Sequence, residues 1–424
     1  MNDMSVHKLR FKADDGNDFP EWKEKEFLDC ISKVVDFRGR TPLKLETNWN
    51  EEKSEYLALS ALNVKNGYID DTIDAHYGNK ELYNIWMKGN ELYKGQVLFT
   101  TEAPMGNVAQ IPDDKPYILS QRTIAFVPDY TLLQDDFLAV LLSSADVQKK
   151  LDTLATGGTA KGVSQKSLKN LSVKIPCLLE QQKIAEFLSA IDIVIEKQKK
   201  TVSIWEERKK GVMQKLFHQE VRFKADDGSE FPEWEKKKIG DVFSKIKDKN
   251  RNGQNKNVIT NSAEFGLINQ RDFFDKDIAV DGKTENYTVI KTGDFVYNPR
   301  KSKQAPYGPF NCYQFEEDGI VSPLYTCLRP KGNIDKKYLL WYFQSGSWYR
   351  FIYENGAQNG ARHDRVGMTD FLMQEIPVYL PQALEEQKKI AECLSSLDNV
   401  IEKQKATLAA WEELKKGLLQ QMFV

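Results

Sequence analysis

The stretch IAEFLSAIDIVIEKQKKTVSIWEERKKGVMQKLF, residues 184–217, recurs in the same chain as IAECLSSLDNVIEKQKATLAAWEELKKGLLQQMF, residues 390–423. The two copies agree at about 21 of 34 positions. Such self-similarity at a fixed offset indicates an internal repeat and is decisive for the fold.

A second repeated block opens each half of the chain. RFKADDGNDFPEW at 10–22 returns as RFKADDGSEFPEW at 222–234, an offset of 212, which is half of the 424 residues. The middles that follow, roughly 23–177 and 235–380, barely resemble each other. Each half therefore consists of a constant start, a variable globule and a constant tail.

Each tail is predicted to be one long helix, because Gly and Pro are absent until Gly211 and Gly417, near its end. Apolar residues recur at spacings of four and three around one mid-stripe glutamine, as in a coiled-coil seam. The alternative is an ordinary amphipathic helix lying on its own globule, but the stripe persists over about five heptads. The predicted pairing positions are Ile184, Leu188, Ile191, Ile195, Gln198, Val202 and Trp205 in the first tail and Ile390, Leu394, Leu397, Ile401, Gln404, Leu408 and Trp411 in the second.

Chain order predicts that the two helices pair antiparallel about a pseudo-twofold axis. Helix one leads from the first globule to the second, and helix two must then run back if it packs on helix one. Gln198 and Gln404 would meet near the axis, with Trp205 beside Leu397. At about 1.5 Å per residue, each helix would separate the globules by about 50 Å.

The predicted fold class is α+β, with two mixed α/β globules separated by the helix pair. Gly- and Asn-rich turns separate runs of strand-forming residues. The expected strands are 56–62, 95–101, 117–127 and 171–176 in the first globule and 257–260, 294–298, 320–329 and 375–380 in the second, with helices at 132–155 and 335–354. The predicted boundaries are 1–177 for the first globule, 178–218 for its helix, 219–380 for the second globule and 381–424 for the last helix.

Composition excludes few functions. Sixty basic and 62 acidic residues give a net charge of −2, which counts mildly against nucleic-acid binding unless cations cluster locally. The mean hydropathy of −0.55 and the lack of a long apolar run argue against a membrane protein. Five scattered cysteines without a CxxC pair predict reduced thiols in a cytoplasmic chain, with neither disulfides nor a metal site.

Motifs for catalysis are missing. GGTAKGVS at 157–164 lacks the lysine of a P-loop, and YNPR at 297–300 stops short of the Asn-Pro-Pro-aromatic loop of amino-methylating enzymes. PDDK at 112–115 is contiguous and bracketed by prolines, as expected of a surface turn, and the four histidines are isolated. We therefore predict no catalytic residue and no metal site.

Loops rich in cations, amides and glycine suit DNA, because Arg and Lys bind phosphate or guanine while Asn and Gln pair with adenine. Solvated turns are the alternative for each of them. The candidate DNA-binding residues are Arg38, Arg40, Thr101, Gln121, Arg122 and Lys161 in the first globule and Asn298, Arg300, Lys301, Lys303, Tyr307, Arg362 and Arg365 in the second.

The pattern resembles the specificity (S) subunit of type I restriction-modification enzymes over essentially the whole chain. The resemblance lies in the proline-led tails KIPCLLEQQKIAEFLSAID (174–192) and YLPQALEEQKKIAECLSSLD (379–398), and in the FPEW starts. The segments GQVLFTTEAPMGNVA (95–109) and TGDFVYNPRKSKQAPYG (292–308) resemble the family's recognition-domain motif. The first globule departs from it with Gln96 where Asp is usual.

The resemblance implies two target-recognition domains that read an asymmetric, bipartite site in double-stranded DNA. It implies two modification (methyltransferase) subunits that use S-adenosylmethionine and restriction subunits that use ATP and Mg, with no cofactor bound by this chain. Charges repeated in both tails, EKQK and WEE…KKG, favour a docking face for two identical partners, although duplication alone would also repeat them. We expect removal of 412–424 to lower the number of bound modification subunits.

Two other functions remain open at this point. A coiled-coil scaffold that binds proteins and never touches DNA suits the near-neutral charge. An enzyme with degenerate motifs is the weaker alternative, because both the phosphate loop and the Asn-Pro-Pro-aromatic loop are missing.

Overall fold

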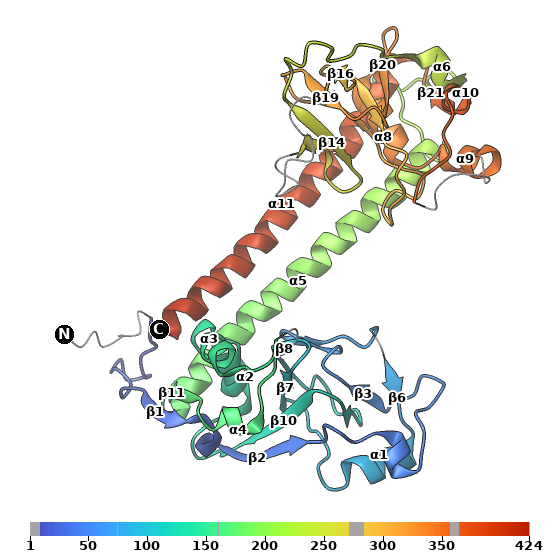
Figure 1. Ribbon diagram of the computed structural model, residues 1–424. Helices are drawn as coiled ribbons and strands as arrows, with labels where there is room; N and C mark the ends of the chain where they lie inside the picture. Colours follow the sequence, from blue (N-terminus) through green and yellow to red (C-terminus); the bar gives the residue numbers. More distant parts are fainter. Residues whose placement is uncertain (1–8, 74, 159–160, 271–283, 357–363, 424) are drawn as a thin grey trace. The chain divides into compact units, whose positions relative to one another are not determined.

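The computed structural model describes residues 9–73, 75–158, 161–270, 284–356 and 364–423 (Figure 1). The chain forms two compact units. Unit 1 comprises Met1–Lys199 together with Thr407–Val424, and unit 2 comprises Lys200–Ala406. Unit 1 therefore contains the beginning of the first long helix and the end of the second. Unit 2 contains the end of the first long helix and the beginning of the second. No described helix is long and apolar enough to cross a membrane.

Unit 1 is built on a four-stranded antiparallel sheet in the order β2-β10-β7-β8. Unit 1 also contains a three-stranded sheet, β6-β3-β9, and the two-stranded sheets β1-β11 and β4-β5. The strands are β1 (Lys23–Glu26), β2 (Ile31–Asp36), β3 (Leu57–Leu59), β4 (Val64–Lys65), β5 (Tyr68–Ile69), β6 (His76–Tyr77), β7 (Val97–Thr101), β8 (Met105–Gln110), β9 (Ile118–Leu119), β10 (Thr123–Pro128) and β11 (Ser172–Ile175). The helices are η1 (Phe27–Cys30), η2 (Pro42–Leu45), α1 (Lys80–Met87), α2 (Asp135–Ser143), α3 (Ala145–Leu154), α4 (Gln165–Leu168) and the first part of α5 (Leu178–Phe217).

The central sheet of unit 1 is covered on both faces. Phe99 and Phe126 point into a core shared with α2, α3 and α5, whereas Leu98 and Ala125 point into a second core shared with α1. Alternate residues of one strand thus enter different cores. This is why the sequence of β7 and β10 is a continuous apolar run rather than an alternating one.

Unit 2 repeats this topology with an unrelated sequence. Its four-stranded sheet, β13-β20-β17-β18, matches β2-β10-β7-β8, and its pair β12-β21 matches β1-β11. The parallel pairing of β14 with β19 matches that of β3 with β9. The strands are β12 (Glu235–Lys238), β13 (Phe243–Lys245), β14 (Val258–Ser262), β15 (Gly266–Asn269), β16 (Thr288–Ile290), β17 (Phe295–Tyr297), β18 (Phe310–Cys312), β19 (Gly319–Val321), β20 (Thr326–Pro330) and β21 (Pro377–Leu380). The helices are α6 (Ile239–Val242), α8 (Lys336–Gln344), α9 (Tyr349–Asn355), α10 (Asp370–Glu375) and the first part of α11 (Leu384–Met422). The α+β prediction is confirmed.

The long helices pair antiparallel inside each unit. In unit 1 the first part of α5 packs with the last part of α11, and Trp411 joins the core that contains Ile191. In unit 2 the last part of α5 packs with the first part of α11 around Leu394 and Leu397. Gln198 and Gln404 belong to different units, so their predicted meeting stays a prediction.

Candidate nucleic-acid interface

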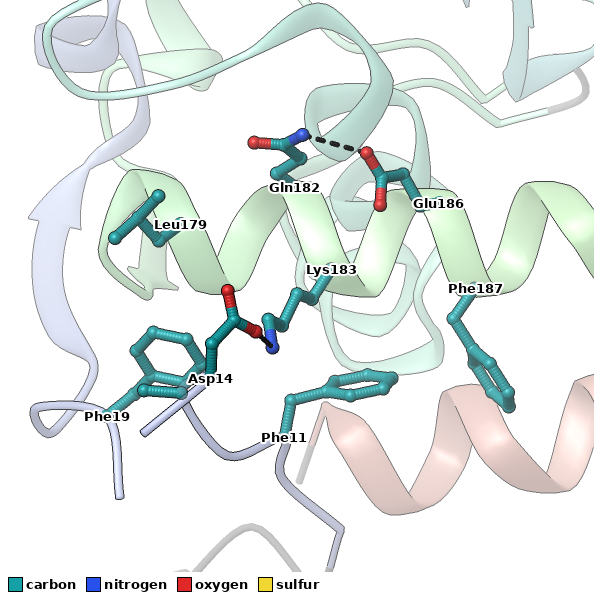
Figure 2. Close-up of a pocket in the computed structure, with 9 residues that line it drawn as sticks. Phe11, Asp14, Phe19, Leu179, Gln182, Lys183, Glu186 and Phe187 are labelled. Carbon is teal, nitrogen blue, oxygen red and sulfur yellow. Dashed lines mark hydrogen bonds and ion pairs between the residues drawn. The ribbon is translucent and has the colours of Figure 1, made fainter. Parts of the chain in front are cut away.

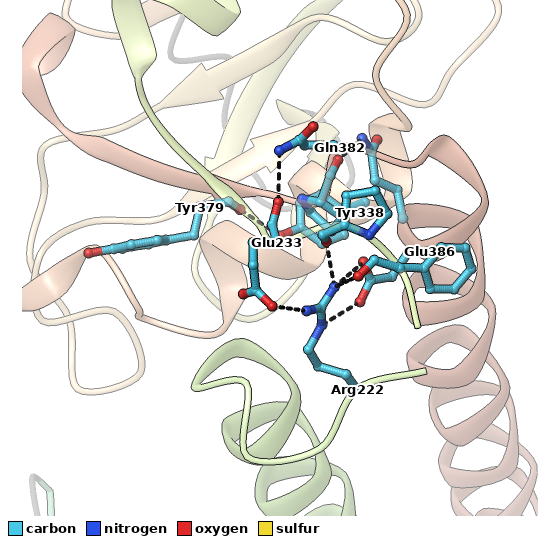
Figure 3. A network of polar contacts seen from close by, with 10 residues as sticks. Arg222, Glu233, Tyr338, Tyr379, Gln382 and Glu386 are labelled. Carbon is cyan, nitrogen blue, oxygen red and sulfur yellow. Dashed lines mark hydrogen bonds and ion pairs between the residues drawn. The ribbon is translucent and has the colours of Figure 1, made fainter. Parts of the chain in front are cut away.

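Each constant start closes over the first turn of a long helix. The Arg10 guanidinium donates to both carboxylate oxygens of Glu180, at 3.1 and 2.9 Å, and to the carbonyls of Phe19 and Pro20. Arg222 makes the same contacts to Glu386, at 3.1 and 3.1 Å, and to Phe231 and Pro232 (Figure 3). Both glutamates are fully buried, so the repeated RFKADDG…FPEW blocks serve the fold.

The repeated charges of the long helices form matched ion pairs. Lys415 contacts Asp192 at 2.6 Å in unit 1, and Lys209 contacts Asp398 in unit 2. Lys199 and Glu412 also have a counterpart in Lys405 and Glu206, at 4.0 and 3.0 Å. Pairing between the two long helices therefore explains several of the charges that the two tails share, and explains them as well as the docking of partners would.

A groove of about 650 Å³ lies between the constant start of unit 1 and the first turns of α5 (Figure 2). Phe11 and Phe187, which line it, pack edge to face with ring centroids 5.5 Å apart, and Leu179 is 67% exposed. The second tail has Glu385 and Cys393 at the positions of Leu179 and Phe187. The constant surfaces of the two units therefore differ in apolar character.

Most candidate residues of unit 1 lie in loops at one end of the strands of its central sheet. β2 and β7 are both antiparallel to β10, so both end where β10 begins, with Asp36 opposite Ile124 and Thr100 opposite Thr123. A backbone bridge joins Glu102 to Gly162 at the same end. We call residues 37–40, 102–104, 121–122 and 161–165 the loop edge of unit 1.

Unit 2 has an equivalent loop edge, which we define as residues 298–308, 322–325 and 364–366. β17 ends opposite the beginning of β20, with Tyr297 opposite Thr326. The loop that follows β17 pairs with residues 364–366, through an Arg300–Arg365 bridge and a bond from Val366 N to Pro299 O of 2.8 Å.

Three cations at the loop edge of unit 1 are paired with carboxylates. Arg38 contacts Asp36 at 2.6 Å, Arg122 contacts Glu102 at 3.3 Å, and Lys161 contacts Asp152 at 3.4 Å. Gln121 is exposed beside Arg122. These four predicted residues lie on the surface, and their contact with DNA stays a prediction.

Two further predicted residues of unit 1 have structural roles. The Arg40 guanidinium lies 3.9 Å from the centre of the Phe37 ring and donates to the Trp86 carbonyl. Thr101 is 1% exposed, and its hydroxyl donates to the Arg122 carbonyl at 3.2 Å. Both side chains make contacts within the fold around the loop edge, and their predicted contact with DNA stays a prediction.

The loop edge of unit 2 presents less compensated charge. Arg300 and Arg365 share one carboxylate, Asp364, at 3.8 and 4.0 Å. Lys301 and Lys303 are exposed, and neither makes an ion pair within the described residues. This edge can attract phosphate, because its cations outnumber its carboxylates.

The remaining predictions for unit 2 fall into three groups. The Asn298 amide is used inside the loop, where its oxygen accepts from Arg300 N at 3.0 Å and its nitrogen donates to Asn261 O at 3.1 Å. Tyr307 packs on Tyr349 with ring centroids 5.0 Å apart, so part of its surface is used within the fold. Arg362 lies outside the described residues.

Sequence reasoning missed the amides and carboxylates that hold these loops. Asn261 is 3% exposed, donates to Val296 O at 2.7 Å and accepts from Asn311, also at 2.7 Å. Asp36 and Gln165 play a comparable part in unit 1, joined by a hydrogen bond of 2.8 Å. These residues bond to groups that are far away in the chain, so the sequence around them did not indicate their role. Asp36 is the exception, because it lies two residues before Arg38.

The comparisons with known proteins agree with this architecture. The model of the type I restriction modification DNA specificity domain matches residues 21–203 and again residues 232–410. A Methanocaldococcus jannaschii chain, named provisionally as the specificity subunit of type I restriction enzyme MjaX, is 25% identical over 96% of this chain and 94% of its own length. The MjaVIII specificity subunit of the same organism is 27% identical over 74% of this chain and 75% of its own.

Solved structures show the same fold. The S subunit of a type I restriction-modification system from M. genitalium superposes with a TM-score of 0.54 at 15% identity, covering 99% of both chains. A structure from a study of complex assembly and conformational transition of the type I R-M system gives a TM-score of 0.55 at 18% identity, covering 95% of this chain and 98% of its own. Because the family model covers most of both halves, the chain belongs to the family of type I restriction-modification DNA specificity subunits, which supply target recognition and not catalysis.

Proposed function

We propose that this chain reads an asymmetric, bipartite site in double-stranded DNA, with one half-site for each unit. The observation that carries the proposal is the repeated topology with unlike loop edges. The same scaffold carries Arg–carboxylate pairs in unit 1 and a cation-rich hairpin in unit 2. Two different chemistries on one architecture suit two different half-sites with an unread spacer between them.

The contacts with DNA would combine positioning and base recognition. Lys301, Lys303 and Arg300 would bind phosphates, which fixes register but carries no sequence information. Arg38, Gln121 and Arg122 would reach base edges, where guanidinium and amide groups distinguish guanine and adenine. Lys161 and Arg365 would complete the two edges as further phosphate ligands.

The same proposal assigns the constant regions to partner subunits. Two modification subunits would dock on the constant starts and helices, bringing S-adenosylmethionine, and restriction subunits would bring ATP and Mg. The groove beside Phe11 and Phe187 supports an apolar contact with such a partner in unit 1. This chain would itself hold none of these cofactors.

Mapping methylated bases in host DNA, with and without this chain, tests the proposal. We expect one split motif, with unlike halves, that disappears when the chain is deleted. Methylation that is independent of the chain would refute the proposal. In a purified complex with modification subunits, association with DNA that is insensitive to salt and shows no sequence preference would favour the protein-binding scaffold instead.

A further inference from the structure

The turn after β2 separates the two arginines of FRGRT. Arg40 N donates to Phe37 O at 3.0 Å, which closes a β-turn, and Gly39 stands at a φ of +88°, where glycine is favoured. Arg40 folds back onto the Phe37 ring. Arg38 is left at the outward corner of the turn, with a side chain 30% exposed.

The Arg38 guanidinium is held from one side only. Its Nε lies 2.9 Å from Asp36 Oδ1, and its Nη2 lies 2.6 Å from Oδ2. The same carboxylate accepts from the Arg38 backbone N–H at 2.9 Å and from Gln165 Nε2 at 2.8 Å. Burial alone would raise the pKa of Asp36, but the hydrogen bonds and charge of Arg38 and the hydrogen bond from Gln165 together outweigh burial and lower it, so the carboxylate stays charged.

The other side of the guanidinium is open. Within the described residues, the two N–H groups of Nη1 and the second N–H of Nη2 make no hydrogen bond. One N–H of Nη1 and the remaining N–H of Nη2 lie on one edge of the planar group, which suits two acceptors side by side. Guanine offers N7 and O6 in that arrangement in the major groove.

Resting on the proposed function, we infer that Arg38 recognises a guanine in the half-site of unit 1 and that Asp36 and Gln165 are its positioning residues. Because the carboxylate fixes the guanidinium beforehand, little rotamer freedom is lost on binding. A phosphate would be repelled by Asp36 and by Glu102, whose charge also acts on Arg38. The site therefore favours the uncharged edge of a base over the DNA backbone.

The test uses the full chain assembled with its modification subunits and a set of duplexes in which each base of the methylated motif is replaced in turn. The wild type should prefer guanine at one position by roughly 5- to 150-fold, as a bidentate contact provides. Arg38→Lys keeps the charge but loses the planar fork, so the preference should fall to about threefold or less at that position alone. Asp36→Asn should reduce the preference at the same position by a smaller factor.

Lys161→Ala, at the same loop edge, is the matched control and should weaken all duplexes equally. The inference is overturned if Arg38→Lys leaves every base preference intact, or if it lowers methylation of all duplexes by one common factor, as a structural role would. A wild-type complex that reads a split motif while Arg38→Lys retains it would refute only this inference. A wild-type complex with no base preference would refute the proposed function as well.

Discussion

Units 1 and 2 share strand order, helix pairing and the contact of Arg10 with Glu180, or of Arg222 with Glu386, that holds the constant start over the helix start and that we call the clasp. They differ where the loops meet solvent. Arg–carboxylate pairs occupy the loop edge of unit 1, and loosely paired cations occupy that of unit 2. The difference teaches that this scaffold fixes where the loops are presented and leaves their chemistry free to vary. The predictions below perturb matched positions in the two units.

The largest effects should come from the aromatic residue at the C-terminal end of each long helix, where Phe217 is the last residue of α5 and Phe423 directly follows α11. Phe423 packs on Trp22 and Phe137 in unit 1, with centroids 5.5 and 5.9 Å apart, and Phe217 packs on Tyr338 and Tyr342 in unit 2. Phe423→Ala should destabilise unit 1 by about 3–5 kcal/mol, and Phe217→Ala should do the same to unit 2. Hydrogen exchange would resolve the two, because each variant should lose protection in one unit only.

Equal loss of protection in both units after either substitution would contradict their independence. The same packing affects our expectation for removal of 412–424, since that truncation also deletes part of the core of unit 1. Loss of bound modification subunits after truncation therefore needs Phe423→Ala as a control.

The next effect concerns the clasp. Arg10→Met should leave Glu180 buried without its cation and cost about 2–3 kcal/mol, somewhat less than a fully buried pair because the guanidinium keeps some contact with water. Arg222→Met should cost a similar amount through Glu386. Denaturant unfolding of both variants checks this; a cost below about 0.5 kcal/mol, as for a surface pair, would show that the clasp is dispensable.

A smaller effect should follow when the buried residue directly before β7, Gln96, is replaced by the aspartate that stands directly before β17, Asp294. Asp294 makes two bonds to Arg329, at 2.8 and 2.7 Å, whereas Gln96, directly before the Val97–Phe126 pair, donates to Phe126 O. Extending that register by one residue gives Val127 the place that Arg329 has in unit 2. Gln96→Asp should therefore destabilise unit 1 by about 1–3 kcal/mol, because a buried carboxylate would lack a cation. Adding Val127→Arg should recover part of the loss in thermal unfolding, and no recovery would refute the pairing.

The smallest effect is electrostatic and appears in DNA binding. Replacing Lys301 and Lys303 by Ala should reduce the slope of log K against log salt by about two, one for each lost phosphate contact. Lys161→Ala should change that slope less, because Asp152 already offsets its charge. Titrations of the assembled complex at several salt concentrations measure this, and equal slopes for both variants would contradict the assigned difference between the loop edges.

The repeat and the helices could be predicted from the sequence because their signals are local and periodic. The expected strands 95–101 and 171–176 contain β7 and β11, and the expected helix 132–155 contains α2 and α3. The shared topology of the unlike globules could not be predicted. Pairings such as β14 with β19 join segments about 60 residues apart, and no local pattern specifies them.

Individual site residues were harder to predict than the loops that carry them. Arg38 and Arg40 are two residues apart in one turn, yet the first pairs with Asp36 and the second packs on Phe37. Asp36, which holds Arg38, is itself held by a hydrogen bond from Gln165, 129 residues away in the chain. Composition could locate a cationic loop, but the division of labour within it depends on long-range contacts.

Grafting residues 23–177 from a relative onto this chain tests the central claim most directly, because that segment omits the clasp and Phe423 and so leaves the shared scaffold in place. Methylated-base mapping of a host carrying the hybrid should show one half of the motif replaced and the other half unchanged. A motif altered in both halves, or in neither, would contradict an account in which each unit recognises its own half-site.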